Sequence, residues 1–492
     1  MPADLNLANL FARIWHDLAR DMATFDRVLR DLADQRTEVL FSAHMLDERL
    51  ATQGPEALAY PYEQISQGDE IETRRVILIA QAIDRWYGRL SSENRMPRQP
   101  ADVALARANR TLLRFGRFNT DTRLGYVLPK RPRWGRWSDP DLELPNAVTS
   151  PWDAFKSLIV TPTEIKATDP DNPLQSRAVR FSYRFVDPTV LRAVEVDWIP
   201  IIGFAPLAEA LDDLDIRLVE QDGKHWYDAQ VRDLSSRVAA AIQALCEAGA
   251  NLIIFPEMVV HPEALNALKG AIATHGPSSQ LRLVLAGTSR QPSGGARPYN
   301  EARLFNHRGT EIGRQRKLHR WNLPRDLRDR YGLQHASLHQ TADLFEFIIP
   351  GEEVIVIEQT QFGRMAVMIC EDLARSEPGQ WLRQRMLLDW LLTPILDGSM
   401  HPSRWMAQRG SNAALGGRCR VIVANSFSLT HRQNTQHKKA GWATLSDCGV
   451  GLCIDIVGGK ARYCLEHLPL RGRSSAVRTI RWNPEDWSEW MR

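Results

Sequence analysis

The sequence has few cysteines, no long apolar run and no leader-like start. Its six cysteines show no CxxC spacing, which in a chain of 492 residues argues against a disulfide framework and against a zinc knuckle. No window approaches 18 uninterrupted apolar residues, so neither a transmembrane helix nor a membrane partner is expected. The opening Met-Pro-Ala-Asp-Leu-Asn lacks the basic and then apolar build of a secretory signal. Together these absences predict a reduced, cytoplasmic protein.

An excess of charge of either sign is also lacking. The chain carries 62 Lys and Arg against 59 Asp and Glu, a net charge of +3, so its overall charge does not argue for a polyanionic partner. Its hydrophobic content of 43% is ordinary for a globular protein, and the length allows two to four domains.

The N-terminal part is predicted to be mainly α-helical. Apolar residues recur at three- and four-residue steps between residues 5 and 50, and again from Thr73 to Leu90. We therefore predict a helical domain over residues 1–135. Such stripes are typical of core faces or partner-helix faces, and nothing before residue 200 forms a recognisable catalytic constellation.

Residues 136–205 are predicted to be a linker with extended patches. The stretch is rich in Pro, Asp, Asn and Ser at its start, which favours irregular structure. Two later segments, Arg177–Val186 and Val194–Phe204, alternate enough to be strands.

One basic and aromatic run stands out in the first half. Residues 101–136 hold nine Arg or Lys against two Asp, with aromatic side chains in or beside the run. Such a mixture can bind phosphates and stack on bases, which makes nucleic-acid binding through residues 107–136 one hypothesis. A solvated face, or an arm packed on another domain, explains the same composition.

From about residue 206 the pattern becomes strand–helix–strand, which predicts a layered α/β domain over residues 206–480. Short apolar runs such as Leu252–Phe255 and Met365–Ile369 predict buried strands. Helices are expected over three segments. These are Asp228–Glu247, Gln384–Trp390 and Ser403–Leu415.

Three chemically capable residues follow strand-like runs in this half: Glu257, Lys317 and Cys370. Singly, each has an ordinary explanation as a helix cap, a solvated cation or a small core residue. Together they supply what acyl transfer from a C–N bond needs. A thiolate attacks, a carboxylate takes and returns the proton, and a cation stabilises the oxyanion.

The blocks around these residues resemble the nitrilase (carbon–nitrogen hydrolase) superfamily. The resemblance covers about residues 210–460 and includes Ala-Asn-Leu-Ile-Ile-Phe-Pro-Glu257, Arg316-Lys317-Leu-His and Gly363 to Leu373. Further matching blocks lie at Asp389-Trp-Leu-Leu-Thr-Pro394, at Gly417 to Asn425 and at Gly441 to Asp447.

The resemblance implies an αββα sandwich, a homodimer or higher homo-oligomer, and no metal or cofactor. It implies Cys370 as the nucleophile that forms a thioester, Glu257 as general base and acid, and Lys317 as oxyanion donor. The backbone N–H of Glu371 is expected to complete the oxyanion hole, and Glu346 is the candidate for a second acid found in many members. Three further residues are expected in the substrate pocket. These are His319, Trp321 and Asn425.

The resemblance implies hydrolysis of a small amide or nitrile, with an amidase or glutaminase-like activity, because Glu371-Asp372-Leu373 resembles the glutaminase-type branch. The connection between Lys317 and Gly351 departs from the family by an Arg- and His-rich insert at residues 325–340. A second hypothesis is a nitrilase-like module kept for assembly or sensing, for instance in bacterial antiphage defence, whose N-terminal half binds a partner or nucleic acid.

Overall fold

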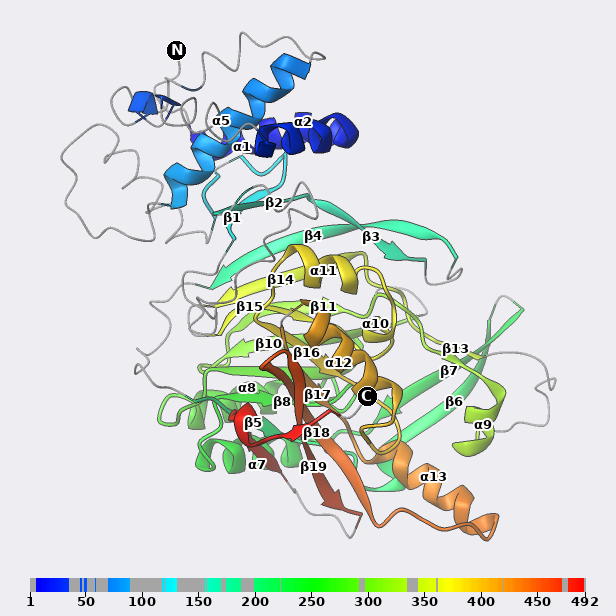
Figure 1. Ribbon diagram of the computed structural model, residues 1–492. Coiled ribbons are helices and arrows are strands. Elements are labelled where there is room, and N and C mark those ends of the chain that lie inside the picture. The colour runs from blue at the N-terminus through cyan, green and yellow to red at the C-terminus, as the bar shows by residue number, and fades with distance from the viewer. Residues whose placement is uncertain are drawn as a thin grey trace. The chain divides into compact units, whose positions relative to one another are not determined.

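The computed structural model describes most of the chain as two compact units (Figure 1). The first comprises residues 1–164, 183–190 and 358–364, and the second comprises residues 165–182, 191–357 and 365–492. The described residues are 6–34, 45–46, 48–50, 58, 70–88, 117–119, 121–130, 155, 157–169, 174–186, 199–221, 223–291, 297–333, 344–359, 362–417, 419–470 and 477–490.

The first unit combines helices with a two-stranded sheet. Its longer elements are α1 (Leu7–Arg20), α2 (Met22–Asp34), α5 (Glu70–Gly88), β1 (Tyr126–Pro129) and β2 (Leu158–Thr161). The apolar stripe of α1 is buried, and Phe11 and Trp15 both make edge-to-face contacts with Phe155. The helical prediction for residues 5–50 and 73–90 is therefore supported in part, since residues 35–44 lie outside the described set.

The second unit contains most of two large sheets. The six-stranded sheet has the order β11 (Glu311–Arg316), β10 (Tyr299–Asn306), β9 (Leu283–Gln291), β8 (Leu252–Ile254), β5 (Ile201–Phe204), β20 (Arg478–Arg481). The nine-stranded sheet has the order β21 (Ser488–Glu489), β19 (Lys460–Pro469), β18 (Asp447–Val457), β17 (Arg420–Ala424), β16 (Trp390–Pro394), β15 (Gly363–Val367), β14 (Glu353–Gln359), β4 (Ser176–Val186), β3 (Glu164–Thr168).

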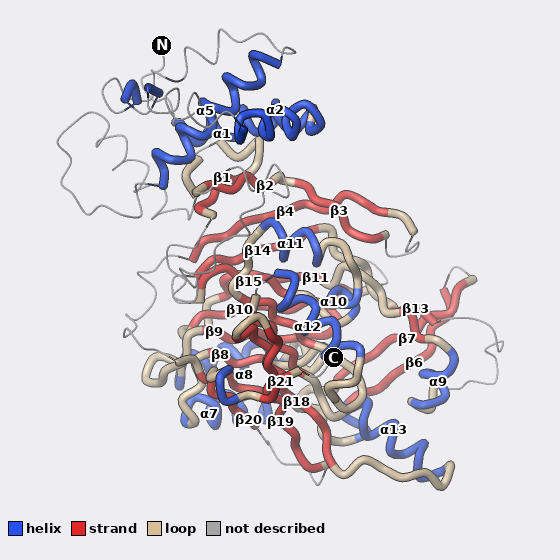
Figure 2. The backbone as a smooth tube through the Cα atoms, in the orientation of Figure 1, coloured by secondary structure: helices blue, strands red, loops and turns tan. Residues whose placement is uncertain are grey.

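The two sheets pack face to face. A Cβ on Gly451 of β18 would meet the ring of Phe204 of β5 at 2.6 Å, and one on Gly313 of β11 would meet Ile357 of β14 at 2.4 Å. β8, β15 and β16 are buried along their whole lengths, which explains why most of their residues are apolar; Arg364 of β15 is buried as the ion-pair partner of Glu358. The α/β class predicted for this half is confirmed (Figure 2).

Helices cover the sheets. α7 (Ser235–Glu247) and α8 (Ala264–His275) share one apolar cluster with β8 and β9, and α12 (Trp405–Gly417) packs on β17 and β18. Shorter or more exposed helices complete the unit. They are α9 (Arg325–Arg330), α10 (Glu371–Ala374), α11 (Gly379–Arg385) and α13 (Ser428–Lys439).

A third, smaller sheet shares the apolar core of α7, α8, β8 and β9. Its order is β12 (Asn322–Leu323), β13 (Leu344–Glu346), β7 (Lys224–Val231), β6 (Leu214–Gln221). β6 and β7 form an antiparallel hairpin, and β13 pairs with β7 in parallel. This sheet is additional to the expected sandwich.

Two predicted helices are wrong in their bounds. The expected helix from Asp228 begins only at Ser235, because β7 runs to Val231 and pairs with β6 along its whole length. The expected helix ending at Trp390 stops at Arg385, because Trp390 opens the buried strand β16 between β15 and β17. Strand pairing overrode the helical spacing in both places.

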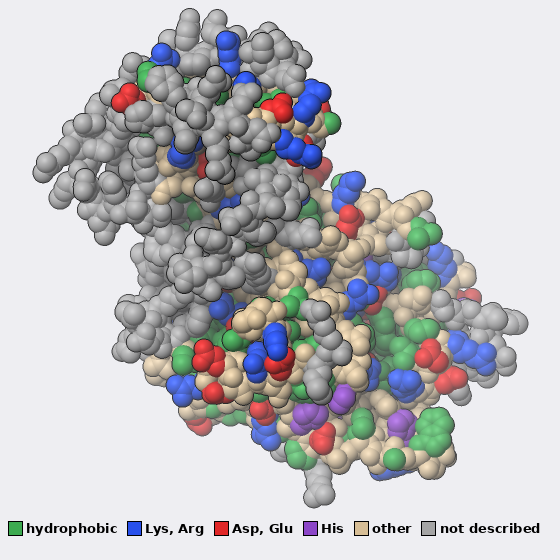
Figure 3. Space-filling model, in the orientation of Figure 1, with side chains coloured by type: hydrophobic (Ala, Val, Ile, Leu, Met, Phe, Trp, Pro, Cys, Tyr) green, Lys and Arg blue, Asp and Glu red, His purple; other side chains and the backbone are tan. Residues whose placement is uncertain are grey.

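Two sequence hypotheses concern residues that the structure describes only in part. Most of the basic and aromatic run at 101–136 lies outside the described residues, and so do residues 194–198 of the strand expected to end at Phe204. On the face of the second unit drawn in Figure 3, described basic and acidic side chains are interspersed. Among the described helices, none has the length and apolarity needed to cross a bilayer.

Candidate active site

Cys370 lies just beyond β15, at the turn into α10. Its backbone has φ 48° and ψ −103°, a conformation that non-glycine residues rarely adopt. Its N–H donates to the carbonyl of Pro394 at 3.0 Å, and its side chain is buried. Local strain of this kind, which costs about 1–3 kcal/mol, clusters at functional positions, where the surrounding structure holds a side chain in place.

Glu257 follows β8 and is held beside the same loop. Its N–H donates to the carbonyl of Ile395 at 3.3 Å, next to the carbonyl that binds the N–H of Cys370. Consecutive peptide groups after β16 thus anchor both residues. β8 belongs to one large sheet and β15 to the other, so the loop after β16 joins the two at this point.

Lys317 lies at the end of β11, and its ammonium group bridges two carboxylates. Nζ donates to Glu257 Oε1 at 2.8 Å and to Glu346 Oε2 at 2.6 Å. Asn300 of β10 closes the cluster, since its Nδ2 donates to Glu257 Oε1 at 2.7 Å and to Glu346 Oε1 at 3.0 Å. The exposed fractions of the Lys317 and Glu257 side chains are both 2%, so the ion pairs are shielded from water.

Burial and charge set the protonation of this cluster. Burial, and then the charge of Glu346, raise the pKa of Glu257, although Lys317 acts in the opposite direction. Burial alone would lower the pKa of Lys317, but the charges of Glu257 and Glu346 raise it well above its ordinary value. Burial and the charge of Glu257 raise the pKa of the Cys370 thiol. These directions favour the protonated thiol of Cys370 and the protonated amine of Lys317 in the resting site.

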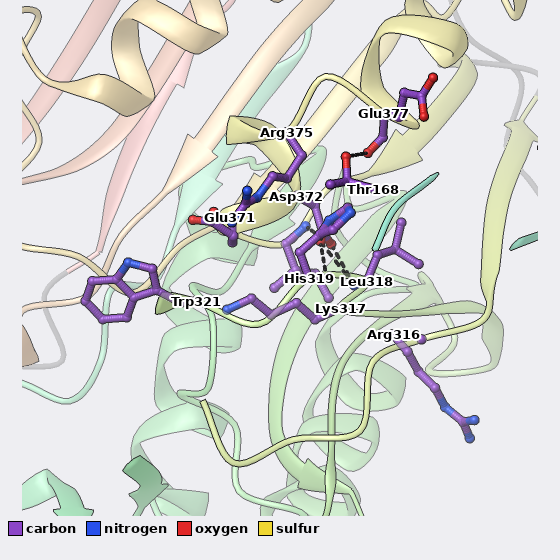
Figure 4. Close-up of polar contacts among 12 residues, drawn as sticks. Thr168, Arg316, Lys317, Leu318, His319, Trp321, Glu371, Asp372, Arg375 and Glu377 are labelled. Carbon is purple, nitrogen blue, oxygen red and sulfur yellow. Dashed lines mark hydrogen bonds and ion pairs between the residues drawn. The ribbon is translucent and has the colours of Figure 1, made fainter. Parts of the chain in front are cut away.

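Asp372 ties the turn after Cys370 to the segment after Lys317. Its Oδ1 accepts hydrogen bonds from the N–H groups of Leu318 at 3.1 Å and His319 at 2.9 Å, and contacts His319 Nδ1 at 2.8 Å (Figure 4). The same carboxylate accepts from Ile369 N at 3.2 Å. Asp372 therefore fixes the spacing between the two predicted catalytic residues.

The other predicted pocket residues have distinct surroundings. Glu371 is paired with Arg375 at 2.7 Å, and His319 Nε2 is buried without a partner among the described residues. The backbone N–H of Trp321 donates to Glu346 Oε2 at 3.2 Å. Asn425 uses both amide atoms on the loop after β16, where it accepts from the Asp397 N–H at 3.1 Å and donates to the Gly398 carbonyl at 2.7 Å. It holds that loop.

The structure therefore brings Glu257, Lys317 and Glu346 into direct contact. The charge of Glu257 raises the pKa of the Cys370 thiol and the charge of Lys317 lowers it. Their catalytic roles stay predictions. Asn300 and Asp372 were not assigned a role from the sequence. Asp372 stands inside the motif Gly363 to Leu373, two residues after Cys370, and Asn300 follows Tyr299 in the buried strand β10, so a polar residue within a buried strand or turn was the available signal.

The cluster combines two carboxylates and an ammonium group with a nearby thiol. Among the described residues, no group of three or more His, Cys, Asp or Glu side chains is arranged to hold a metal ion. All six cysteines are free.

Gly287 of β9 sets the position of Glu257. A Cβ there would meet the Pro256 carbonyl oxygen at 1.8 Å and the Cα of Glu257 at 3.0 Å. We expect Gly287→Ala to lower the free energy of unfolding by about 1–3 kcal/mol. It should also lower kcat/KM by about 100-fold, because a displacement of about 1 Å misplaces the carboxylate.

Chemical denaturation and ammonia release measure these two effects. The matched control is Gly270→Ala in α8, where a Cβ would meet nothing within 4 Å. This change should stabilise the helix by about 0.5–1 kcal/mol and leave activity intact. Equal behaviour of the two variants would contradict the assigned role of Gly287.

Fold and site together define a class: a two-sheet α/β domain that presents a buried cysteine near a lysine–carboxylate cluster. Residues 222–427 match the family model described as carbon-nitrogen hydrolase. The resemblance predicted from the sequence is thereby confirmed. A comparison with curated proteins found no match.

Solved structures of the nitrilase superfamily are similar to this chain at low identity. Nit3 of Saccharomyces cerevisiae is 12% identical, with 58% of this chain and 91% of that chain covered and a TM-score of 0.36. An amidase from Nesterenkonia sp. is 14% identical, with 58% and 91% covered and a TM-score of 0.36. The C. elegans NitFhit protein is 16% identical, with 55% and 61% covered and a TM-score of 0.36. These likenesses add no residue-level detail to the family match.

Proposed function

We propose that the second unit is a thiol amidohydrolase that acts on a small linear amide through a covalent thioester at Cys370. The observation that carries the proposal is Lys317, which is buried between Glu257 and Glu346 and close enough to Cys370 to oppose the rise in the pKa of its thiol. Burying an ammonium group with two carboxylates costs desolvation free energy. A reaction in which charge develops beside these groups would explain why the chain keeps them buried.

In the first half-reaction, Glu257 takes the thiol proton while Sγ attacks the amide carbon. The oxyanion accepts hydrogen bonds from Lys317 Nζ and from the backbone N–H of Glu371. When the C–N bond breaks, Glu257 returns the proton to the leaving nitrogen, and ammonia departs. The acyl group stays on Cys370 as a thioester.

In the second half-reaction, water replaces the nitrogen. Glu257 takes a proton from the water, whose oxygen attacks the thioester carbon, and the C–S bond breaks with return of the proton to sulfur. The carboxylic acid leaves and the thiol is restored. Glu346 and Asn300 keep Lys317 and Glu257 in place through both steps.

The pH profile tests the role of Glu257. The carboxyl must be ionised to accept the thiol proton, and its pKa is raised above 4.5, so kcat/KM should fall with decreasing pH through a midpoint above 4.5. Glu346→Gln removes a like charge and should move that midpoint to lower pH. Glu263→Gln changes an exposed carboxylate and should leave it unmoved. A midpoint at or below 4.5 would argue against Glu257 as the base.

Ammonia release from a panel of amides, with glutamine and aliphatic amides included, tests the activity itself. We expect the wild-type chain to release ammonia from at least one small amide, with the corresponding acid formed in equal amount. No release from any amide, or release without acid, would sink the proposal.

A further inference from the structure

The small sheet brings one more side chain to the candidate site. In the parallel pairing of β13 and β7, Glu346 is the direct partner of Tyr227, and the Phe347 N–H donates to the Tyr227 carbonyl at 2.9 Å. Tyr227 is buried, and its ring lies edge-on to Trp321 with centroids 5.8 Å apart. The β6–β7 hairpin, which is additional to the two large sheets, thus delivers an aromatic residue beside Glu346.

The hydroxyl group of Tyr227 is poorly satisfied. Among the described residues, its hydrogen-bond partner is the Trp321 carbonyl at 3.5 Å, the outer limit of such a bond. Burial, followed by the charges of Glu346 and Glu257 and the thiol of Cys370, raises the pKa of Tyr227 well above its ordinary value. The phenol therefore stays protonated, a buried donor close to the reacting groups.

Acidic groups outnumber the cations around this donor. Lys317 is shared between Glu257 and Glu346, and Arg375 is engaged by Glu371. A substrate carboxylate held there would add a further negative charge in buried surroundings, where like charges are costly. A neutral or cationic substituent avoids that cost, and aromatic side chains favour cations.

We propose that Tyr227 contacts the substrate beside the scissile amide, and that this acid-rich site takes neutral or cationic amides and disfavours amides that carry a carboxylate. The proposal rests on the proposed amidohydrolase function. It deepens that function by naming the charge class of the substrate and a residue that binds it.

Three amides of matched length test the charge class: pentanamide, 4-aminobutanamide and glutaramate. The kcat/KM for ammonia release from the first two should exceed that for glutaramate by at least about tenfold. Equal or better hydrolysis of glutaramate would overturn the inference and leave the proposed function standing. If neither these three amides nor any other amide released ammonia, both the inference and the proposed function would be overturned.

Tyr227→Phe tests the contact, because it removes one oxygen and keeps the ring. We expect about a tenfold fall in kcat/KM for pentanamide, with the far-UV and thermal unfolding profiles unchanged. The matched control is Tyr463→Phe on β19, where the ring packs on Trp490 at 5.3 Å; it should behave as wild type. Wild-type kinetics in the Tyr227 variant would overturn its assignment.

Discussion

Cys370→Ala is expected to abolish amide hydrolysis, with a loss of at least about 10⁴-fold in kcat. The alanine variant lacks the only atom that can form the thioester, and removal of a nucleophile from a catalytic set costs about as much as removal of the whole set. The Glu257–Lys317–Glu346 cluster should survive, since its hydrogen bonds do not involve sulfur. Ammonia release under saturating amide measures the effect.

A second buried cysteine supplies the matched control. Cys419 precedes β17, is fully buried and places its sulfur 3.6 Å from the Ala413 carbonyl. Cys419→Ala removes the same thiol group from the core and should keep near wild-type kcat. Equal ammonia release by Cys370→Ala and the wild type would rule out the thioester route.

Lys317→Ala is expected to damage both activity and stability. Loss of one oxyanion donor raises the barrier by about 2.7–4 kcal/mol, which lowers kcat about 10²–10³-fold. The change also leaves Glu257 and Glu346 buried together without their shared cation. Breaking a buried ion pair costs about 3–5 kcal/mol of folding free energy.

The stability loss should depend on pH. Without the ammonium group, burial and mutual repulsion favour the protonated carboxyls in the folded state, so their folded pKa values lie above the unfolded ones. The loss is then full above the folded pKa and shrinks as pH falls through it. Urea denaturation at pH 7.5 and 5.5 measures this, with Lys224→Ala at the exposed start of β7 as control. A pH-independent loss equal to that of Lys224→Ala would contradict the buried ion pairs.

Much of the site was predictable because its residues follow buried strands. The apolar runs Leu252–Phe255 and Met365–Ile369 indicate β8 and β15, and such strands end at sheet edges where polar residues converge, so Glu257 and Cys370 stood out. The motif Arg316-Lys317-Leu-His identified the cation. These three positions could be predicted from the local sequence, and the structure places Lys317 in contact with Glu257.

Contacts between distant segments could not be read in the same way. Glu346 was a weak candidate, because a long insert separates it from Lys317 and its place depends on β13 pairing with β7. Tyr227 was hidden for a related reason, since the residues just after it, from Asp228, were expected to start a helix. The positive φ of Cys370 has no sequence signature, because it is imposed by the peptide groups that surround it.

The central claim is a covalent acyl intermediate on Cys370, and mass spectrometry of acid-quenched enzyme tests it most directly. Wild-type protein mixed with a substrate amide and quenched within one turnover should gain the mass of the acyl group on the peptide that contains Cys370. Addition of hydroxylamine before the quench should remove the adduct by cleaving the thioester. Absence of the adduct during rapid turnover, or its presence on another residue and in Cys370→Ala, would contradict the account.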